Sequence, residues 1–382
     1  MTAASLFDLT PALRVALLGL AVASGPLAWV WLRNKKAAPG HRLAALTVLT
    51  LFLTFDLVLF GAFTRLTDSG LGCPDWPGCY GNASPTGALP QIRAEEARMP
   101  TGPVTHDKAW VEMVHRYLAT GVGVLITTLA VGTWLQRKRG VPVQARWPVF
   151  TLAWVCLQGA FGALTVTMKL FPAIVTMHLL GGMVLLALLA LQAVAYRQAE
   201  RGSGPMLVAA SLRHWLVGAS ALLWLQIALG GWVSTNYAVL ACSTFPACQG
   251  SWWPDMNFHQ GFELWRALGM TGQGEPVTFS ALTAIHYTHR LVAYALFVVL
   301  GVLAWRLRGT ALHRTSSIVA ALMLWQFASG LSNVVLGWPL VAAVAHTGGA
   351  AGLVVALTWA LSESRVAAST AVAAVSAREA SA

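Results

Sequence analysis

Long apolar runs separated by short polar segments dominate the chain. Nine of these runs approach or exceed the about 20 residues that a membrane-spanning helix needs. They lie at about 12–32, 43–65, 110–135, 147–168, 172–196, 209–235, 280–305, 314–336 and 339–361. The pattern predicts an all-α integral membrane protein in which an eight-helix core follows one extra N-terminal helix.

The first run, 12–32, also has the position of a signal peptide. It is longer than the apolar part of a signal peptide, it lacks a clear small-residue cleavage site, and a basic cluster follows it. We therefore expect it to be retained as a transmembrane helix.

Composition and charge exclude other classes. Only 10% of the residues are charged and 57% are hydrophobic, whereas soluble domains carry about 25% charged residues. A soluble enzyme and a disordered protein are both excluded. A net charge of +11 would normally suggest nucleic acid as a partner. Here the basic residues form short clusters between apolar runs, so we expect membrane lipid around the chain and no nucleic-acid partner.

The loop charges predict the orientation. Basic clusters occupy alternate connections, whereas most acidic residues lie in the long loops 66–109 and 236–279. The positive-inside rule places the basic connections in the cytoplasm and the two long loops outside. We expect a multi-pass protein of the bacterial inner membrane with a cytoplasmic C-terminus, whose end, 365–382, is predicted to be disordered.

The eight core helices form two groups of four with recurring features. The features are the loops 61–81 and 230–250, each with Cys-x5-Cys around a proline; EMVHR (112–116) and HYTHR (286–290); Gln158 before Gly162 and Gln326 before Gly330; and Pro172 before His178 and Pro339 before His346. Four features in one order indicate duplication. We predict four segments: 1–41 with the extra helix, four-helix halves at 42–200 and 201–364, and the tail 365–382. Since each half has an even number of helices, a pseudo-two-fold axis along the membrane normal should relate them.

Four histidines lie at similar depth, one on each even-numbered core helix: His115, His178, His289 and His346. At about 1.5 Å per residue they lie roughly 8–15 Å below the outer surface. An ionisable residue within a span is costly and suggests function. Two imidazoles from facing helices are suitable axial ligands of a haem iron, and neighbouring glycines would leave room for the macrocycle (Gly181, Gly182, Gly348 and Gly349). The alternative is that each histidine only bonds to a neighbouring helix.

Charged residues flank two of these histidines. Arg116 and Arg290 could each pair with a haem propionate, or else extend to lipid headgroups. Glu112 shares a helix face with His115, whereas the second half has His286 at that position. The halves should therefore have different tasks. Glu112 is either a proton-handling or cation-stabilising group, or a structural partner of a loop or of Arg116.

The cysteines of the outer loops form two local pairs, Cys73 with Cys79 and Cys242 with Cys248. The outer side of a bacterial membrane permits disulfides. Structural disulfides and a redox-active role both stay open, whereas metal binding by four thiolates does not suit an oxidising compartment.

Together these motifs resemble the haem A synthase family of bacteria and mitochondria. The resemblance covers about 42–361 and rests on TRLTDSGLGCPDWPGCYG, EMVHR, MHLLGG, THR and AHTGG. In that family two successive hydroxylations oxidise the C8 methyl group of haem O to the formyl group of haem A, for use in cytochrome oxidase. The resemblance implies a membrane oxidoreductase. The helix at 12–32 departs from the family core, which starts near Arg42.

The resemblance also implies the roles of individual residues. His115 and His178 would bind the haem O substrate, His289 and His346 would bind a haem B cofactor, and Glu112 would be catalytic. The implied partners are the farnesyltransferase that makes haem O and an electron donor that the sequence does not identify. A homo-oligomer stays open.

Two other functions compete with this one. A di-haem b-type membrane cytochrome that exchanges electrons with quinone would need the four histidines but no carboxylate beside one pair, so the difference between Glu112 and His286 argues against it. A transporter built from repeats would explain the duplication but not the matched histidines.

Overall fold

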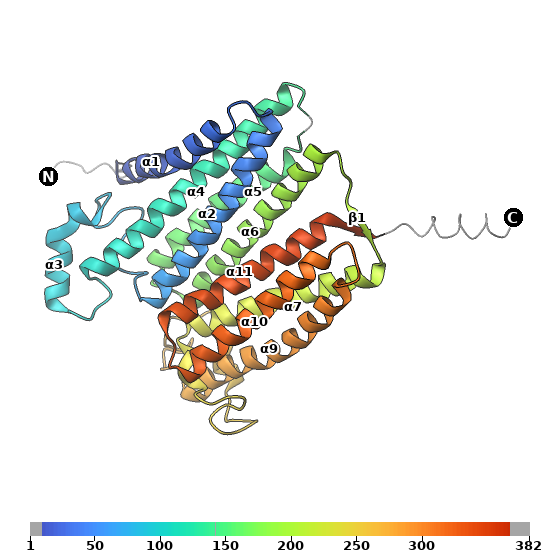
Figure 1. The fold of residues 1–382 in the computed structure, drawn as a ribbon. Coiled ribbons are helices and arrows are strands. Elements are labelled where there is room, and N and C mark those ends of the chain that lie inside the picture. Colours follow the sequence, from blue (N-terminus) through green and yellow to red (C-terminus); the bar gives the residue numbers. More distant parts are fainter. Residues whose placement is uncertain (1–9, 142, 367–382) are drawn as a thin grey trace, which may run out of the picture.

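Nine long apolar helices make up most of the molecule. The computed structural model describes residues 10–141 and 143–366, and within them nine helices are long and apolar enough to cross a membrane. They are α1 (Thr10–Arg33), α2 (Pro39–Leu66), α4 (His106–Lys138), α5 (Arg146–Thr167), α6 (Pro172–Arg201), α7 (Ala210–Thr235), α9 (Phe279–Leu307), α10 (His313–Val335) and α11 (Leu340–Glu363) (Figure 1). Each lies on one predicted run, so the prediction of an all-α membrane protein is confirmed.

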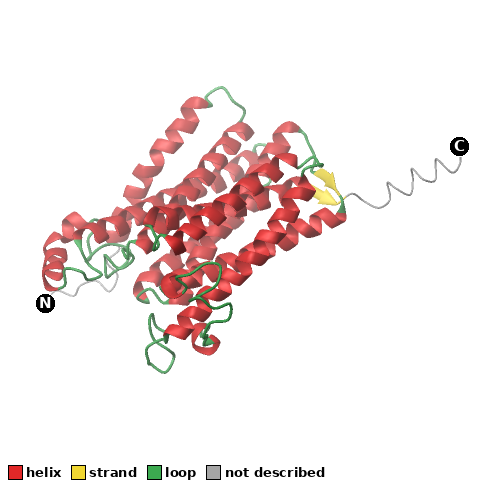
Figure 2. Ribbon diagram, turned by 60° about the horizontal axis from the view of Figure 1, so that its bottom comes forward, coloured by secondary structure: helices red, strands yellow, loops and turns green. Residues whose placement is uncertain are grey.

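Short elements lie between the long helices. The first long loop contains η1 (Pro85–Ala88) and α3 (Leu89–Arg98), and the second contains η2 (Ala238–Ala241) and α8 (Phe258–Gly261). At the opposite end of the molecule β1 (Met206–Val208) pairs in parallel with β2 (Ser364–Val366) (Figure 2). The first two residues of the tail predicted to be disordered therefore lie in a strand, because β1 offers them hydrogen-bond partners. Residues 367–382 of that tail lie outside the described residues.

Local sequence sets where these helices begin. Pro172 lies in the first turn of α6, where the amide hydrogen that proline lacks would have no partner within the helix. The side chains of Thr105 and Thr278 cap α4 and α9, because their hydroxyls accept hydrogen bonds from Lys108 N at 3.3 Å and Ala281 N at 3.4 Å. The two helices that hold His115 and His289 thus start with the same kind of cap.

The packing of the helices repeats. In the first half α2 packs on α4 and α6, and α5 packs on α6; in the second half α7 packs on α9 and α11, and α10 packs on α11. Between the halves α6 meets α11, and the contact of α2 with α11 is matched by that of α7 with α6. A two-fold axis passing between α6 and α11 would produce this set of contacts.

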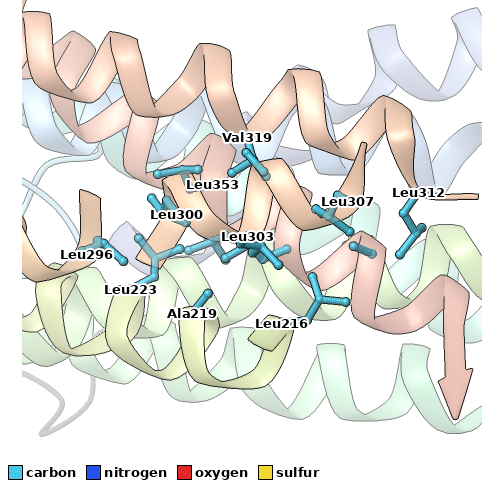
Figure 3. Close-up of a cluster of buried hydrophobic side chains, with 14 of the residues drawn as sticks. Leu216, Ala219, Leu223, Leu296, Leu300, Leu303, Leu307, Leu312, Val319 and Leu353 are labelled. Carbon is cyan, nitrogen blue, oxygen red and sulfur yellow. The ribbon is translucent and has the colours of Figure 1, made fainter. Parts of the chain in front are cut away.

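The largest apolar cluster joins the second half to α6. Leu223, Leu300, Val319 and Leu353 come from α7, α9, α10 and α11 and meet in its centre (Figure 3). Other large apolar side chains point outward, among them Phe150 and Val298, which are 60% and 67% exposed. An outer surface of this kind suits contact with lipid.

Helix α1 packs along α4, outside the eight-helix core. Its Gly19 lies against Thr120, and Gly121 of α4 lies against Val22. Small residues at such a crossing let two helices approach closely. Val15 of α1 also joins the buried cluster that contains Cys73, so α1 covers the disulfide loop of the first half.

Candidate functional site

The structure places the four predicted histidines in two facing pairs. All four lie in the N-terminal parts of α4, α6, α9 and α11, at the end of the molecule that carries the disulfide loops. His115 lies near His178, and His289 lies near His346. Each half therefore brings together two imidazoles from two helices.

A glycine on a neighbouring helix lies against each imidazole. A Cβ atom added to any of these glycines would lie 3.0–3.4 Å from the Cε1 atom of the ring. The pairs are Gly61 with His115, Gly162 with His178, Gly230 with His289, and Gly330 with His346. We call these four residues the cradle glycines. Two of them, Gly61 and Gly230, were not singled out in the sequence, although they begin the two matching segments GAFTRL and GGWVST.

The glycines predicted to make room for a macrocycle have other neighbours. A Cβ atom on Gly181 would meet the side chain of Gln158, and one on Gly349 would meet that of Gln326. These two glycines face α5 and α10, where they make room for glutamine side chains. That the glycines beside the histidines leave room for a macrocycle stays a prediction.

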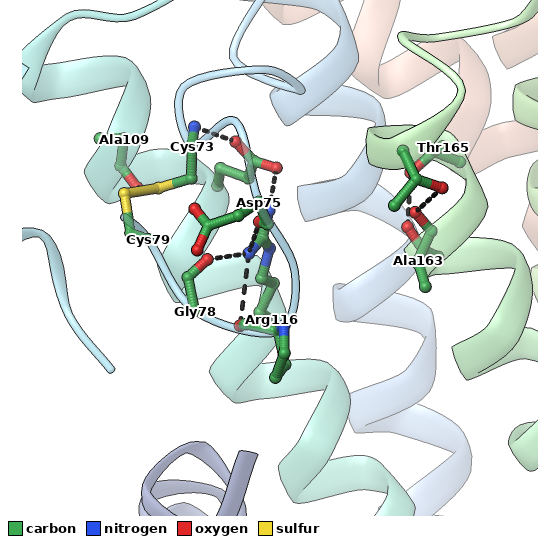
Figure 4. A network of polar contacts seen from close by, with 12 residues as sticks. Cys73, Asp75, Gly78, Cys79, Ala109, Arg116, Ala163 and Thr165 are labelled. Atoms are coloured by element: carbon green, nitrogen blue, oxygen red, sulfur yellow. Dashed lines mark hydrogen bonds and ion pairs between the residues drawn. A yellow bond between two sulfur atoms is a disulfide. The ribbon is translucent and has the colours of Figure 1, made fainter. Parts of the chain in front are cut away.

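Glu112 lies in a buried network that joins α4 to the first disulfide loop. Its side chain is 5% exposed. Its Oε2 accepts a hydrogen bond from Cys73 N at 2.8 Å, and its Oε1 accepts one from Arg116 Nη2 at 2.5 Å. Arg116 also donates to the carbonyl oxygens of Asp75 at 2.9 Å and Gly78 at 2.5 Å (Figure 4). The carboxylate is therefore held in one position by a backbone amide and a guanidinium group.

The second half holds its disulfide loop in a similar way but without the carboxylate. Arg290 donates to the carbonyl oxygens of Thr244 at 2.6 Å and Ala247 at 2.8 Å. His286 replaces the glutamate, and its Nδ1 lies 3.0 Å from the carbonyl oxygen of Ala238. The arginines in both halves thus bind carbonyl oxygens of the loops that fold back over their helix turns. Pairing of these arginines with haem propionates stays a prediction.

Both cysteine pairs are joined as disulfides. Cys73 is bonded to Cys79, and Cys242 to Cys248. The cysteines are buried, and each loop is closed directly above the arginine that binds it. In the structure the disulfides shape the loops that the two arginines hold.

The facing imidazoles fit a haem iron with two axial ligands. Each pair offers two nitrogen donors from two helices, and Nδ1 of His115 is buried without a hydrogen-bond partner among the described residues. The same residues contain no group of three or more His, Cys, Asp or Glu side chains that could hold a metal ion alone. A haem would suit such pairs, because its macrocycle supplies the other ligands of the iron and only two are needed from the protein.

A cavity with a volume of about 810 Å³ lies at the end of the molecule that carries β1 and β2. Its lining includes Arg146, Arg213, Trp224 and Arg365. It is separate from the histidine pairs, which lie toward the other ends of α6 and α11.

Comparison with known proteins places the chain in a family. A family model described as cytochrome oxidase assembly protein, COX15-CtaA, matches residues 17–358. The chain belongs to the COX15-CtaA family. The match to this family begins inside α1, upstream of the core start near Arg42 that the sequence suggested.

Several relatives of this chain bear the name heme A synthase. A protein named heme A synthase from Shewanella oneidensis is 37% identical over 310 residues, which cover 81% of this chain and 92% of the relative. Proteins of the same name from Allorhizobium ampelinum and Halalkalibacterium halodurans are 30% and 26% identical, over 79% and 76% of this chain and 85% and 86% of their own lengths. The similarity therefore spans most of both chains in each comparison.

Proposed function

We propose that this protein is a membrane oxidoreductase that converts the C8 methyl group of haem O to the formyl group of haem A. One observation carries the proposal: two similar bis-histidine sites differ by a buried carboxylate, Glu112, that is present beside only one of them. An electron-transfer protein would not need this difference. Relatives that bear the name heme A synthase along most of their length support the same reaction.

The two halves would have separate tasks. In our proposal His115 and His178 bind the haem O substrate, and His289 and His346 bind haem B. When bound, haem B supplies one-electron transfer to the reacting half. The cradle glycines make room for the imidazole rings in both halves, which supports a histidine pair as the ligand set of each half.

Glu112 would act on the carbon that is oxidised. It lies three residues before His115, so both side chains project from the same face of α4. A carboxylate there would stabilise positive charge that develops at the methyl carbon, or would accept the proton released from it. Cys73 N and Arg116 fix its position in advance, and a fixed charge needs little reorganisation during the reaction.

The surroundings of the reaction follow from the same proposal. The loops with the disulfides would face the outer side of a bacterial inner membrane, and the end with β1 and β2 would face the cytoplasm. The enzyme that attaches the farnesyl chain would supply haem O. The product would serve the assembly of cytochrome oxidase.

Co-expression tests the proposal. The chain is produced in a host that makes haem O but no haem A, and haems extracted from the membranes are separated by chromatography. We expect haem A to appear only when the chain is present. If the purified protein carries haem B alone and no haem A forms, the chain is an electron-transfer cytochrome and the proposed reaction is wrong.

A further inference from the structure

The cavity at the end of the molecule that carries β1 and β2 lies between the two halves. Its wall comes from α5 and α6 of the first half and from α7 and α11 of the second. In Figure 1 α11 leads to this end, where β1 is labelled. The volume of about 810 Å³ lies within the about 300–1,000 Å³ of pockets that bind small molecules. No histidine lines the cavity, so a ligand there would be distinct from a haem held by the histidine pairs.

Three arginines give one end of the cavity a strong positive charge. Arg146 begins α5, Arg213 lies in the first turn of α7, and Arg365 lies in β2. The lining contains no aspartate or glutamate. In the part of the chain that the structure describes, none of the three arginines forms an ion pair with a carboxylate. A cleft lined by charge of one sign attracts ligands of the opposite sign.

The acidic residues at this end of the molecule have other partners. Glu363, the last residue of α11, forms an ion pair with Arg197 at 3.2 Å, and Glu200 near the end of α6 pairs with His41. Neither glutamate lines the cavity. The three guanidinium groups of the lining are therefore left for an anion that comes from outside the chain.

Hydrogen bonds hold two of these arginines in place and leave part of each guanidinium group free. Arg213 Nη1 donates to the carbonyl oxygens of Ser364 at 2.7 Å and Leu361 at 3.2 Å, and Arg365 Nη1 donates to that of Ser364 at 3.0 Å. The Nη2 atoms of both have no acceptor among the described residues. Arg146 lies over the ring of Trp147 at 5.1 Å from its centroid. Guanidinium groups fixed in this way suit the oxygens of a phosphate group.

The rest of the lining is mostly apolar and extends along the helices. Ala187 lies on α6, Trp224 on α7 and Val354 on α11. Trp224 follows Arg213 by 11 residues on the same helix, which is roughly 16 Å at about 1.5 Å per residue. The hydrocarbon core of a bilayer is about 30 Å thick, so the apolar part reaches about as far as one leaflet. The cavity thus has a cationic end and an apolar end, as a site for an anionic amphiphile requires.

We propose that this cavity binds an anionic phospholipid of the surrounding membrane, with its phosphate among Arg146, Arg213 and Arg365 and an acyl chain between α6, α7 and α11. Basic pockets between membrane helices bind anionic headgroups on the cytoplasmic side, which this end faces in the proposed orientation. A zwitterionic lipid carries a cation that the arginines would repel, and free phosphate would leave the apolar part unfilled. Because the cavity lies between the halves, the bound lipid would stabilise their packing.

Lipid titration tests the inference on the purified full-length chain in detergent. Phosphatidylglycerol, phosphatidylcholine with the same acyl chains, and inorganic phosphate are added in turn. We expect phosphatidylglycerol to raise the midpoint of thermal unfolding and to stay bound in native mass spectrometry, whereas the other two leave the midpoint unchanged. An equal rise with phosphatidylcholine would mean that only the apolar part binds, and an equal rise with phosphate would mean an anion site without lipid. Either result would overturn the inference.

A double variant tests the charged end. Arg146→Gln combined with Arg365→Gln keeps Arg213, whose hydrogen bonds join α7 to β2. Each arginine near a membrane surface contributes about fivefold to attraction of anionic lipid, so this variant should bind phosphatidylglycerol roughly 25-fold more weakly. Arg308→Gln with Arg314→Gln removes the same charge at the same end but outside the lining, and should bind like the parent. Equal weakening in both double variants would show general surface attraction and refute a site in the cavity.

Ala187→Phe tests the apolar end. The added ring would occupy the space of the acyl chain, so phosphatidylglycerol should bind more weakly although all three arginines remain. Ala221→Phe, at an exposed position of α7 outside the lining, is the control and should bind like the parent. If Ala187→Phe does not fold, Ala195→Phe gives the same test in the same wall. Parent-like binding in a folded variant of this wall would contradict the placement of the chain. These measurements need no turnover, so their outcome is independent of the reaction proposed above.

Discussion

The two halves of the molecule have the same helix packing and the same kind of disulfide loop, which an arginine binds in each half. They differ around one histidine of each pair. At the loop end Glu112 in the first half corresponds to His286 in the second. Leu57 lies four residues before Gly61 in the first half, and Gln226 lies at the corresponding place before Gly230 in the second. Only the first half has an additional helix, α1, against its disulfide loop among the described residues.

Comparison of the halves distinguishes residues that maintain the fold from residues that could serve a reaction. Features found in both halves, such as Arg116 and Arg290 on their loop carbonyls, hold the loops in place. The features found in one half lie beside His115. A duplicated scaffold thus allows the function of one site to be assigned from its contrast with the other.

The largest expected effect follows from removing Glu112. Glu112→Ala should lower haem A formation by at least about 100-fold, since general acid–base groups contribute about 10²–10⁴-fold, while the haem B spectrum of the second half stays intact. Glu112→Gln should be nearly as impaired because it lacks the charge. Chromatography of extracted haems gives both results.

His286→Ala is the matched control at the corresponding place. We expect it to reduce haem A formation far less than Glu112→Ala does. Equal losses in the two variants, or haem A at the parent level in Glu112→Ala, would mean that Glu112 only supports the loop.

A smaller contrast should appear between the two disulfides. Cys73 N donates to Glu112 Oε2, whereas Cys242 contributes only its carbonyl oxygen, to Arg290 at 3.2 Å. Replacing Cys73 and Cys79 by alanine should lower haem A formation, because the loop that carries Cys73 N would no longer be closed over Glu112. The same change at Cys242 and Cys248 should cost less. Haem A yield per protein measures both, and a larger loss at the second loop would contradict the account.

The smallest effect concerns the packing of α1. A Cβ atom on Gly19 would lie 2.6 Å from Thr120 Cβ, whereas one on Gly25 would have nothing within 4 Å. Gly19→Leu should therefore destabilise the protein by about 1–3 kcal/mol relative to Gly25→Leu. Thermal unfolding in detergent compares the two variants, and equal midpoints would show that the crossing of α1 with α4 does not depend on Gly19.

Much of the fold was predictable because spanning a membrane imposes long apolar runs. All nine helices follow from such runs, and the repeat follows from motifs spaced alike in both halves. The pairing of the histidines was also predictable, because four residues at one depth on alternate helices can meet in pairs across a bundle.

The details of the site were harder to predict from the sequence. The bonds of Arg116 to the disulfide loop could not be predicted, because the way this loop folds back onto α4 depends on contacts between residues distant in sequence. The roles of Gly181 and Gly349 depend on which helix each faces. Gly61 and Gly230 were not predicted as cradle glycines, because glycine is too common in apolar helices to indicate such a role by itself.

The most direct test of the account is the identity of the haem that each half binds. Protein with His289→Ala and His346→Ala, and protein with His115→Ala and His178→Ala, are each purified from cells that supply haem O, and their haems are extracted and separated. The account predicts haem O without haem B in the first protein, and haem B without haem O or haem A in the second. The same haem composition in both proteins would contradict the division of tasks between the halves.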